Sequence, residues 1–156
     1  MPNALERLGR SKYIPFIKID GAWKRVDKST VGDYTANEVT EDFDYIDNDD
    51  TVTEVTGNNA SISLEIANID GNPVYDYMED MLVNLPTGED AKVEYLFCFG
   101  GSGLKAQKGT ATVTDKALSP TDQKITFTLS VVEKETGTYT IDEGVPSYTA
   151  DEIETP

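Results

Sequence analysis

The sequence of 156 residues contains no histidine, one cysteine and one tryptophan. Without histidine the chain cannot build a Ser-His-Asp or Cys-His catalytic site, and it lacks the imidazole ligand of the usual zinc sites. Paired carboxylates remain the main catalytic option, but nothing in the sequence marks out one pair among the 29 acidic residues. We therefore expect a protein that is not an enzyme and that has neither catalytic residues nor a cofactor.

The single cysteine, Cys98, cannot form a disulfide within the chain, and it lies in a strand-like apolar run. We expect a buried thiol, which fits synthesis in a reducing cytoplasm. The sequence also lacks an apolar run of about 18 residues, and its first dozen residues, MPNALERLGRSK, contain no hydrophobic core of a signal peptide. Neither a secretion signal nor a membrane span is expected.

Positive charge is scarce, because 13 Lys and Arg residues face 29 Asp and Glu residues and the net charge is −16. This balance argues against nucleic-acid binding by neutralisation of phosphates. Residues 1–28 carry seven basic and three acidic residues, whereas the rest of the chain carries six basic and 26 acidic residues. Such a basic arm can bind the acidic body of a neighbouring copy, and the alternative is a solvated, mildly basic terminus.

A single helix is predicted between Asp70 and Gly88. Asn72 is a good N-cap, and Pro73 suits the first helical position because its φ is fixed and its missing N–H would be unpaired there anyway. Apolar residues then recur at steps of three and four, which predicts a helix of about twelve residues with one buried face. The apolar positions are Val74, Tyr77, Met78, Met81, Leu82 and Leu85.

The rest of the chain alternates in the manner of β-strands. We expect strands over residues 13–19, 22–26, 34–45, 51–56, 60–66, 91–99, 109–114 and 125–131, and a short one over 138–141. Asp20-Gly21 indicates a tight hairpin, and Pro15 indicates an edge strand or a bulge. Strands in hairpin order with one helix predict a mainly β chain of the α+β kind, with antiparallel sheets packed face to face and the helix over an edge or end.

We expect one domain over residues 1–141, with an N-terminal arm (1–11) and an extended acidic loop (about 42–57). Residues 142–156 are expected to form a loose acidic tail. The segment Asp47-Asn48-Asp49-Asp50 is rich in oxygen ligands, but the EF-hand pattern fails, because Val52 and Asn58 stand where glycine and glutamate are needed. A solvated loop, or an acceptor for a basic surface, is the better interpretation, and no metal site is predicted.

The order of these segments resembles the major tail protein, or tail tube protein, of long-tailed, siphovirus-like bacteriophages. The resemblance spans nearly the whole chain. It rests on the N-terminal hairpin with Trp23, on YIDNDDTVTEVTGNNASISLEIANIDGNPVYDYM, on AKVEYLFCFGG, and on KGTATVTDKALSPTDQKITFTLSVV. Its specific element is the order of a VTG turn, an ISLE strand, a DGNP helix entry and three Thr-rich strands.

The resemblance implies an antiparallel β-sandwich or barrel-like tail tube fold with one flanking helix over about residues 72–85. It implies a structural virion protein that assembles itself into stacked, hexameric rings, forming the tail tube through which DNA passes without adhering. The implied partners are further copies of the chain, a tape-measure protein and tail-end proteins, with no membrane binding. The implied location is the phage tail, after assembly in the host cytoplasm.

Contacts between copies are expected in the termini and in the extension before the strand at residue 61. The expected contact residues are Arg7, Arg10, Lys12, Tyr45, Ile46, Asp47, Asp49, Asp50, Val52, Val55, Tyr139 and Ile141. Three alternatives stay open: a tube subunit of a phage-tail-like particle, a carbohydrate- or receptor-binding module of a virion with Trp23 as aromatic platform, and a calcium-dependent adhesive domain.

Overall fold

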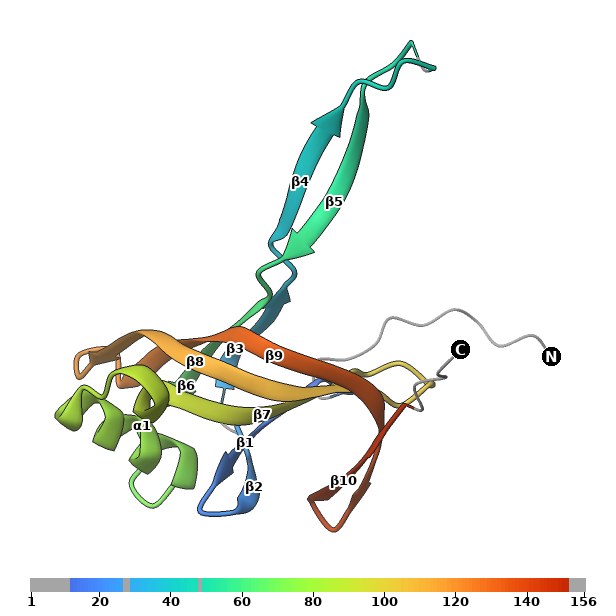
Figure 1. Cartoon of the computed structure of the whole chain (residues 1–156). Helices are drawn as coiled ribbons and strands as arrows, with labels where there is room; N and C mark the ends of the chain where they lie inside the picture. Colours follow the sequence, from blue (N-terminus) through green and yellow to red (C-terminus); the bar gives the residue numbers. More distant parts are fainter. Residues whose placement is uncertain (1–11, 27–28, 48, 152–156) are drawn as a thin grey trace.

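The computed structural model describes residues 12–26, 29–47 and 49–151, and for residues 29–31 it describes the backbone alone. These residues form ten strands, one α-helix and one short 3₁₀ turn (Figure 1). The strands are β1 (Ile14–Ile19), β2 (Ala22–Arg25), β3 (Ser29–Thr35), β4 (Glu38–Phe43), β5 (Val52–Asn58), β6 (Ser61–Ala67), β7 (Lys92–Cys98), β8 (Lys105–Ser119), β9 (Lys124–Asp142) and β10 (Val145–Ala150). The helix is α1 (Pro73–Asn84), and the 3₁₀ turn is η2 (Gly88–Ala91). The predicted mainly β chain with one helix is confirmed.

Eight of the strands form one antiparallel sheet in the order β2-β1-β7-β8-β9-β6-β3, with β10 paired to a further stretch of β9. At its centre, the strands expected over 91–99, 109–114 and 125–131 pair in hairpin order as β7, β8 and β9. The remaining two strands, β4 and β5, pair only with each other and project from the body (Figure 1).

The sheet curls so that it faces itself. Tyr34 on β3 packs against Phe97 on β7 and against Phe99 just after that strand, with ring centroids 5.6 and 5.7 Å apart. In the sheet, β8, β9 and β6 separate β3 from β7. The hydroxyls of Tyr34 and Tyr95 both donate to Oε1 of the buried Gln107, over 3.1 and 2.7 Å. The expected face-to-face packing is therefore achieved within a single hydrogen-bonded sheet. Its main core includes Ile17, Ile62, Leu64, Ile66, Val93, Val113, Ile125, Phe127 and Leu129.

A second apolar cluster lies on the opposite face of β7. It contains Phe16, Leu96, Cys98, Ala106 and Tyr139, with Trp23 and Tyr148 packed against it. Because β7 contributes to both clusters, it is buried on both faces, as its unbroken apolar run predicts.

Cys98 is fully buried in this cluster, and burial raises the pKa of its thiol from 9.0 to about 12. Above about pH 9 an unfolded chain loses this proton while the folded chain keeps it, so the free energy of unfolding falls as the pH rises toward 12. We expect the urea midpoint to drop between about pH 8 and about pH 10.5, and to drop less in Cys98→Ala. Equal pH slopes in the two proteins would contradict this account of Cys98.

Helix α1 begins as predicted. Asn72 is the N-cap, and its Oδ1 accepts a hydrogen bond of 3.0 Å from the N–H of Val74. Val74, Met78 and Met81 are buried in the main core, and α1 contacts β1 and β2 at one edge of the sheet. Leu85 does not belong to the buried stripe, because it forms the left-handed C-cap (φ 47°) and is 68% exposed. The stripe ends at Leu82.

Removing the N-cap by Asn72→Ala is expected to destabilise the protein by about 1 kcal/mol, because the N–H of Val74 loses its acceptor in a buried place. Urea denaturation measures the loss. Asn84→Ala, at the exposed C-terminal end of the same helix, is the control and should change stability by less than about 0.5 kcal/mol. Equal effects of the two substitutions would argue against the cap.

Two strand predictions at the N-terminal half are corrected. The strand expected over 34–45 is broken into β3 and β4 at Ala36-Asn37, where Asn37 takes a left-handed conformation (φ 48°). Strand β1 is not an edge, since it lies between β2 and β7. The carbonyl of Pro15 points toward the β2 side and accepts a hydrogen bond from the N–H of Val26, just past the end of β2. In an antiparallel strand the N–H of a residue points the same way as its carbonyl, so the N–H that proline lacks would also lie on this side and not toward β7. Pro15 is therefore tolerated in an inner strand.

The predicted loose C-terminal tail is wrong for residues 145–150. Strand β9 continues as far as Asp142, and β10 folds back on it with Tyr148 opposite Tyr139. Gly137 allows this approach, because a Cβ there would lie 2.2 Å from the carbonyl oxygen of Thr149. Residues 152–156 of the expected tail lie outside the described part of the chain.

Candidate assembly interface

The hairpin of β4 and β5, called the arm below (residues 38–58), stands away from the body of the protein (Figure 1). Its two strands are paired from Glu38 opposite Asn58 to Phe43 opposite Val52, with one register shift after Val39. Neither core cluster contains a residue of the arm. An isolated two-stranded hairpin is marginally stable in water, and the arm gains no support from either core cluster.

The base of the arm is fixed by two asparagines. The Nδ2 of Asn37 donates to the carbonyl of Asn59 and to Oγ of Ser61, each over 3.0 Å. The N–H of Asn59 returns a hydrogen bond of 3.1 Å to the carbonyl of Asn37. These bonds close the chain across the break between β3 and β4 and set the direction in which the arm leaves the body.

We expect Asn37→Ala to loosen the base of the arm, because alanine loses both side-chain hydrogen bonds and is strained at a positive φ by about 1 kcal/mol. Hydrogen exchange of the amides of β4 and β5 should become faster while that of β7 is unchanged. The control Asn37→Gly removes the hydrogen bonds but keeps the backbone conformation, so its effect should be smaller. Protection in β4 and β5 that is unaltered by Asn37→Ala would contradict this role.

Along the arm, side-chain hydrogen bonds join the two sides of the hairpin. Thr53 donates to Asp42 over 2.7 Å, Thr51 donates to Asp44 over 2.6 Å, and the hydroxyl of Tyr45 donates to Glu54 over 2.9 Å. The hydrogen bond to Glu54 is the main reason that the pKa of Tyr45 is raised above its usual value. The rings of Phe43 and Tyr45 stack at a centroid distance of 5.8 Å. These contacts stiffen a hairpin that has no core of its own.

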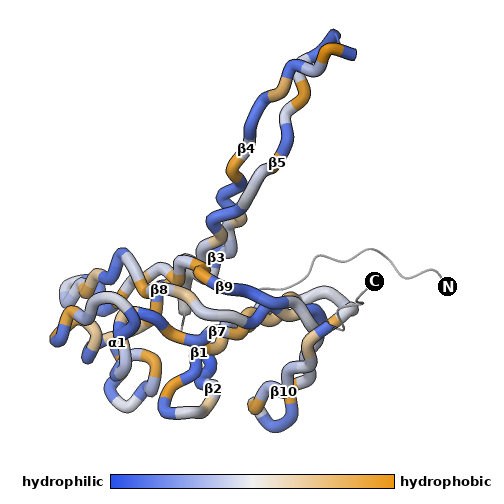
Figure 2. Tube along the Cα trace, viewed as in Figure 1, coloured by the Kyte–Doolittle hydropathy of each residue, from blue (hydrophilic) through white to orange (hydrophobic). Residues whose placement is uncertain are grey.

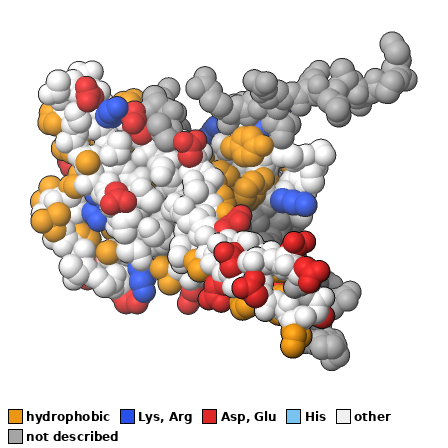
Figure 3. Space-filling view, turned by 90° about the horizontal axis from the view of Figure 1, so that it is seen from above, with side chains coloured by type: hydrophobic (Ala, Val, Ile, Leu, Met, Phe, Trp, Pro, Cys, Tyr) orange, Lys and Arg blue, Asp and Glu red, His pale blue; other side chains and the backbone are white. Residues whose placement is uncertain are grey.

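The surface of the arm is both acidic and apolar. It carries eight carboxylates, namely Glu38, Glu41, Asp42, Asp44, Asp47, Asp49, Asp50 and Glu54, and no Lys or Arg. Figure 3 shows acidic side chains gathered over the arm, and Figure 2 shows hydrophobic segments between them and at the tip. Val39, Val55 and Ile46 are 41%, 56% and 106% exposed. The arm thus presents exposed apolar side chains among its carboxylates.

The structure brings most of the predicted contact residues together on the arm. Tyr45, Ile46, Asp47, Asp49 and Asp50 form its tip, and Val52 and Val55 lie on β5. The expected acidic loop (42–57) is thus largely a hairpin, and its contact role remains a prediction. The predicted contact residues do not include Val39 and Phe43 on β4, although both lie on the same hairpin and Phe43 stacks on Tyr45.

The other predicted contact residues lie on the body. Lys12 is exposed just before β1, and Ile141 is 38% exposed near the end of β9. Tyr139 is 8% exposed, and its hydroxyl donates to the carbonyl of Phe99, so within this chain it is a packing residue. Arg7 and Arg10 lie outside the described residues, with the rest of the predicted N-terminal segment 1–11. Asn48 also lies outside them.

Within the described ranges, no three His, Cys, Asp or Glu side chains come together as metal ligands. No helix in the part of the chain that the structure describes is long and apolar enough to cross a membrane.

The fold is shared with chains of tail and tail-like particles. A chain from the tail of an empty gene transfer agent (GTA) particle, determined with C6 symmetry, superposes with a TM-score of 0.61 at 14% identity, covering 92% of this chain and 100% of that one. A chain from the six-fold symmetrised baseplate of the anti-feeding prophage (AFP) gives a TM-score of 0.50 at 9% identity, covering 88% and 97%. No protein-family model and no curated protein matches the sequence. At these identities the likeness shows the fold, and the expected tail tube fold is confirmed.

Proposed function

We propose that this chain is the structural subunit of a tail tube: copies close into rings of six, and the rings stack into a conduit for DNA. The observation that carries the proposal is the arm, an ordered hairpin with exposed apolar residues on a fold shared with chains of six-fold symmetric tail particles. A siphovirus-like tail and a phage-tail-like particle are both compatible with such a subunit. The tape-measure and tail-end partners, and assembly in a host cytoplasm, belong to the same proposal.

Open sheet edges support closure of the ring. In the described sheet, β2, β3 and the outer side of β10 each leave a row of backbone groups without a strand partner. Such edges favour pairing with another chain, and pairing between neighbouring copies would cover the edges of β2 and β3. In this arrangement the sheets of the copies join around the ring while the arms reach toward the next ring.

Charge supports passage of DNA without adhesion. Six copies at −16 give −96 per ring, so a duplex inside the tube meets a wall of its own sign. Phosphates are repelled instead of being held, as a conduit requires.

The alternative of a carbohydrate- or receptor-binding module is not favoured by the position of Trp23. This side chain packs against the second cluster, and the ammonium of Lys18 lies 5.7 Å from the centre of its ring. It is therefore not a free aromatic platform of the kind that stacks on sugars.

Assembly can be tested directly with the purified chain. Sedimentation velocity over a range of concentrations, followed by negative-stain electron microscopy, should show rings and then tubes. A chain that remains monomeric at high concentration, even when tail-initiating proteins are added, would overturn the proposal.

A further inference from the structure

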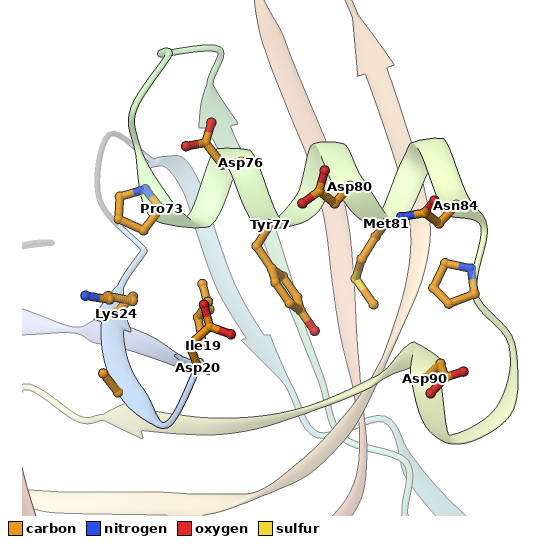
Figure 4. Close-up of a pocket in the computed structure, with 12 residues that line it drawn as sticks. Ile19, Asp20, Lys24, Pro73, Asp76, Tyr77, Asp80, Met81, Asn84 and Asp90 are labelled. Atoms are coloured by element: carbon orange, nitrogen blue, oxygen red, sulfur yellow. The ribbon is translucent and has the colours of Figure 1, made fainter.

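A groove of about 710 Å³ lies between helix α1 and the hairpin of β1 and β2 (Figure 4). Ile19, Tyr77 and Met81 line its apolar part, and Pro73 and Pro86 line it near the two ends of the helix. Tyr77 and Met81 point from the helix into the groove in Figure 4. Ile19 and Tyr77 are half-buried, so the groove offers part of their apolar surface to an occupant, while Met81 is packed into the main core beneath it.

The groove is also acidic. Asp20, Asp76, Asp80 and Asp90 line it, against one basic residue, Lys24. None of the four carboxylates forms a salt bridge within the described residues. The pKa of Tyr77 is raised by burial and, secondarily, by the charge of Asp20 beside it. An occupant must therefore combine positive charge with small apolar anchors.

We propose that the groove binds the N-terminal segment of a neighbouring copy, residues 3–11, an inference that rests on the proposed assembly of copies. This segment, NALERLGRS, places Leu5 and Leu8 among Arg7 and Arg10, and its one acid is Glu6. The leucines suit the apolar part of the groove. The guanidinium groups suit the carboxylates of Asp76 and Asp80, because Arg pairs with carboxylates through two parallel hydrogen bonds.

The arm is a poor occupant of the same groove. Its eight carboxylates and lack of Lys or Arg would set like charges against the four aspartates of the groove. Like-charge contacts of this kind disfavour a wrong partner by several kcal/mol. The acidic arm and the basic N-terminal segment are therefore suited to different surfaces.

The segment that fills the groove must come from a second copy. Lys12 lies against Gly100 at one end of β1, and the groove begins at Ile19, at the other end. The backbone from Lys12 to Ile19 covers about 23 Å in extended form. Arg10 and Arg7 precede Lys12 by two and five residues, so their Cα atoms can reach at most about 7 and 18 Å from it. The two arginines of the same chain cannot both reach the groove.

Mixing two cysteine variants tests this contact. Leu8→Cys is placed in one full-length chain and Asp80→Cys in another, and the mixture is oxidised and run on a denaturing gel. We expect a covalent dimer of the two chains, several-fold more abundant than with the control pair Leu8→Cys and Ser147→Cys on the exposed part of β10. Cys98 stays in place because it is buried. Equal yields from the two pairs would overturn the inference.

Charge reversal provides the second measurement. Asp76→Lys/Asp80→Lys should raise the concentration needed for assembly about tenfold or more, and adding Arg7→Glu/Arg10→Glu to the same chain should restore it. Melting temperature is followed in parallel, because a lysine near the start of α1 also weakens the helix slightly. Tubes without the crosslink and without the charge effect would overturn the groove contact and leave the tube proposal intact. A crosslink in a protein that forms no tubes would support the groove contact and reject the tube.

Discussion

A chain in which residues 39–57 are replaced by a short Gly-Ser linker is expected to fold normally and to form no tubes. The body should be unaffected, because neither core cluster includes a residue of the arm and the base is already closed by Asn37 and Asn59. Assembly should be lost, because the arm carries the exposed apolar residues that a neighbouring ring would cover. Sedimentation and electron microscopy report the tubes, and circular dichroism reports the fold.

A point variant refines the same test. Ile46 at the tip is fully exposed, so Ile46→Asp cannot disturb the core but would place another charge in the proposed contact. Ile46→Leu keeps an apolar side chain of the same size at this position and serves as the matched control. Tubes that form equally well without the arm, or with Ile46→Asp, would contradict a role of the arm in assembly.

Gly109→Ala is expected to cost about 3 kcal/mol or more, a large part of the stability of a domain of this size. A Cβ at Gly109 would lie 1.9 Å from the carbonyl oxygen of Glu133 and 2.8 Å from the Cα of Lys134. Both atoms belong to the backbone of β9, so no side-chain rotation can relieve the clash. The register of β8 and β9 shifts at the next residue pair, where Thr110 faces Glu133 and Ala111 faces Val131. Glycine therefore lets the two longest strands approach at a bulge.

The control for this substitution is Gly101→Ala, in the loop between β7 and β8, where an added Cβ would meet nothing within 4 Å. It should change the stability by less than about 0.5 kcal/mol. Urea denaturation compares the two variants with the parent chain. A Gly109→Ala midpoint close to that of Gly101→Ala would show that β8 and β9 are not packed as described.

Local signals in the sequence predicted the elements that depend on local chemistry. Asn72-Pro73 fixed the start of α1 because capping and a fixed φ act within one turn of the chain. Asp20-Gly21, with φ values of 51° and 81°, forms the expected tight hairpin. The apolar alternation likewise identified β6 and β7, whose buried faces depend on the pattern of one strand alone.

Long-range geometry accounts for what was missed. The break at Asn37 depends on hydrogen bonds to Asn59 and Ser61, which lie more than 20 residues away in sequence. The extension of β9 to Asp142 depends on its pairing with β8 and β10. The residues from Glu133 onward are mostly polar, so they show little of the apolar alternation by which a strand is recognised. The acidic extension could be recognised from its charge, but the face of the arm that meets another copy is set by that copy's surface. No pattern within one chain encodes it directly.

Cryo-electron microscopy of the assembled particle tests the central claim most directly. We expect rings of six copies with joined sheets, and density for β4 and β5 that extends from each copy onto a copy in the adjacent ring. Assemblies in which the arm folds back on its own body, or in which copies touch only through other surfaces, would contradict it.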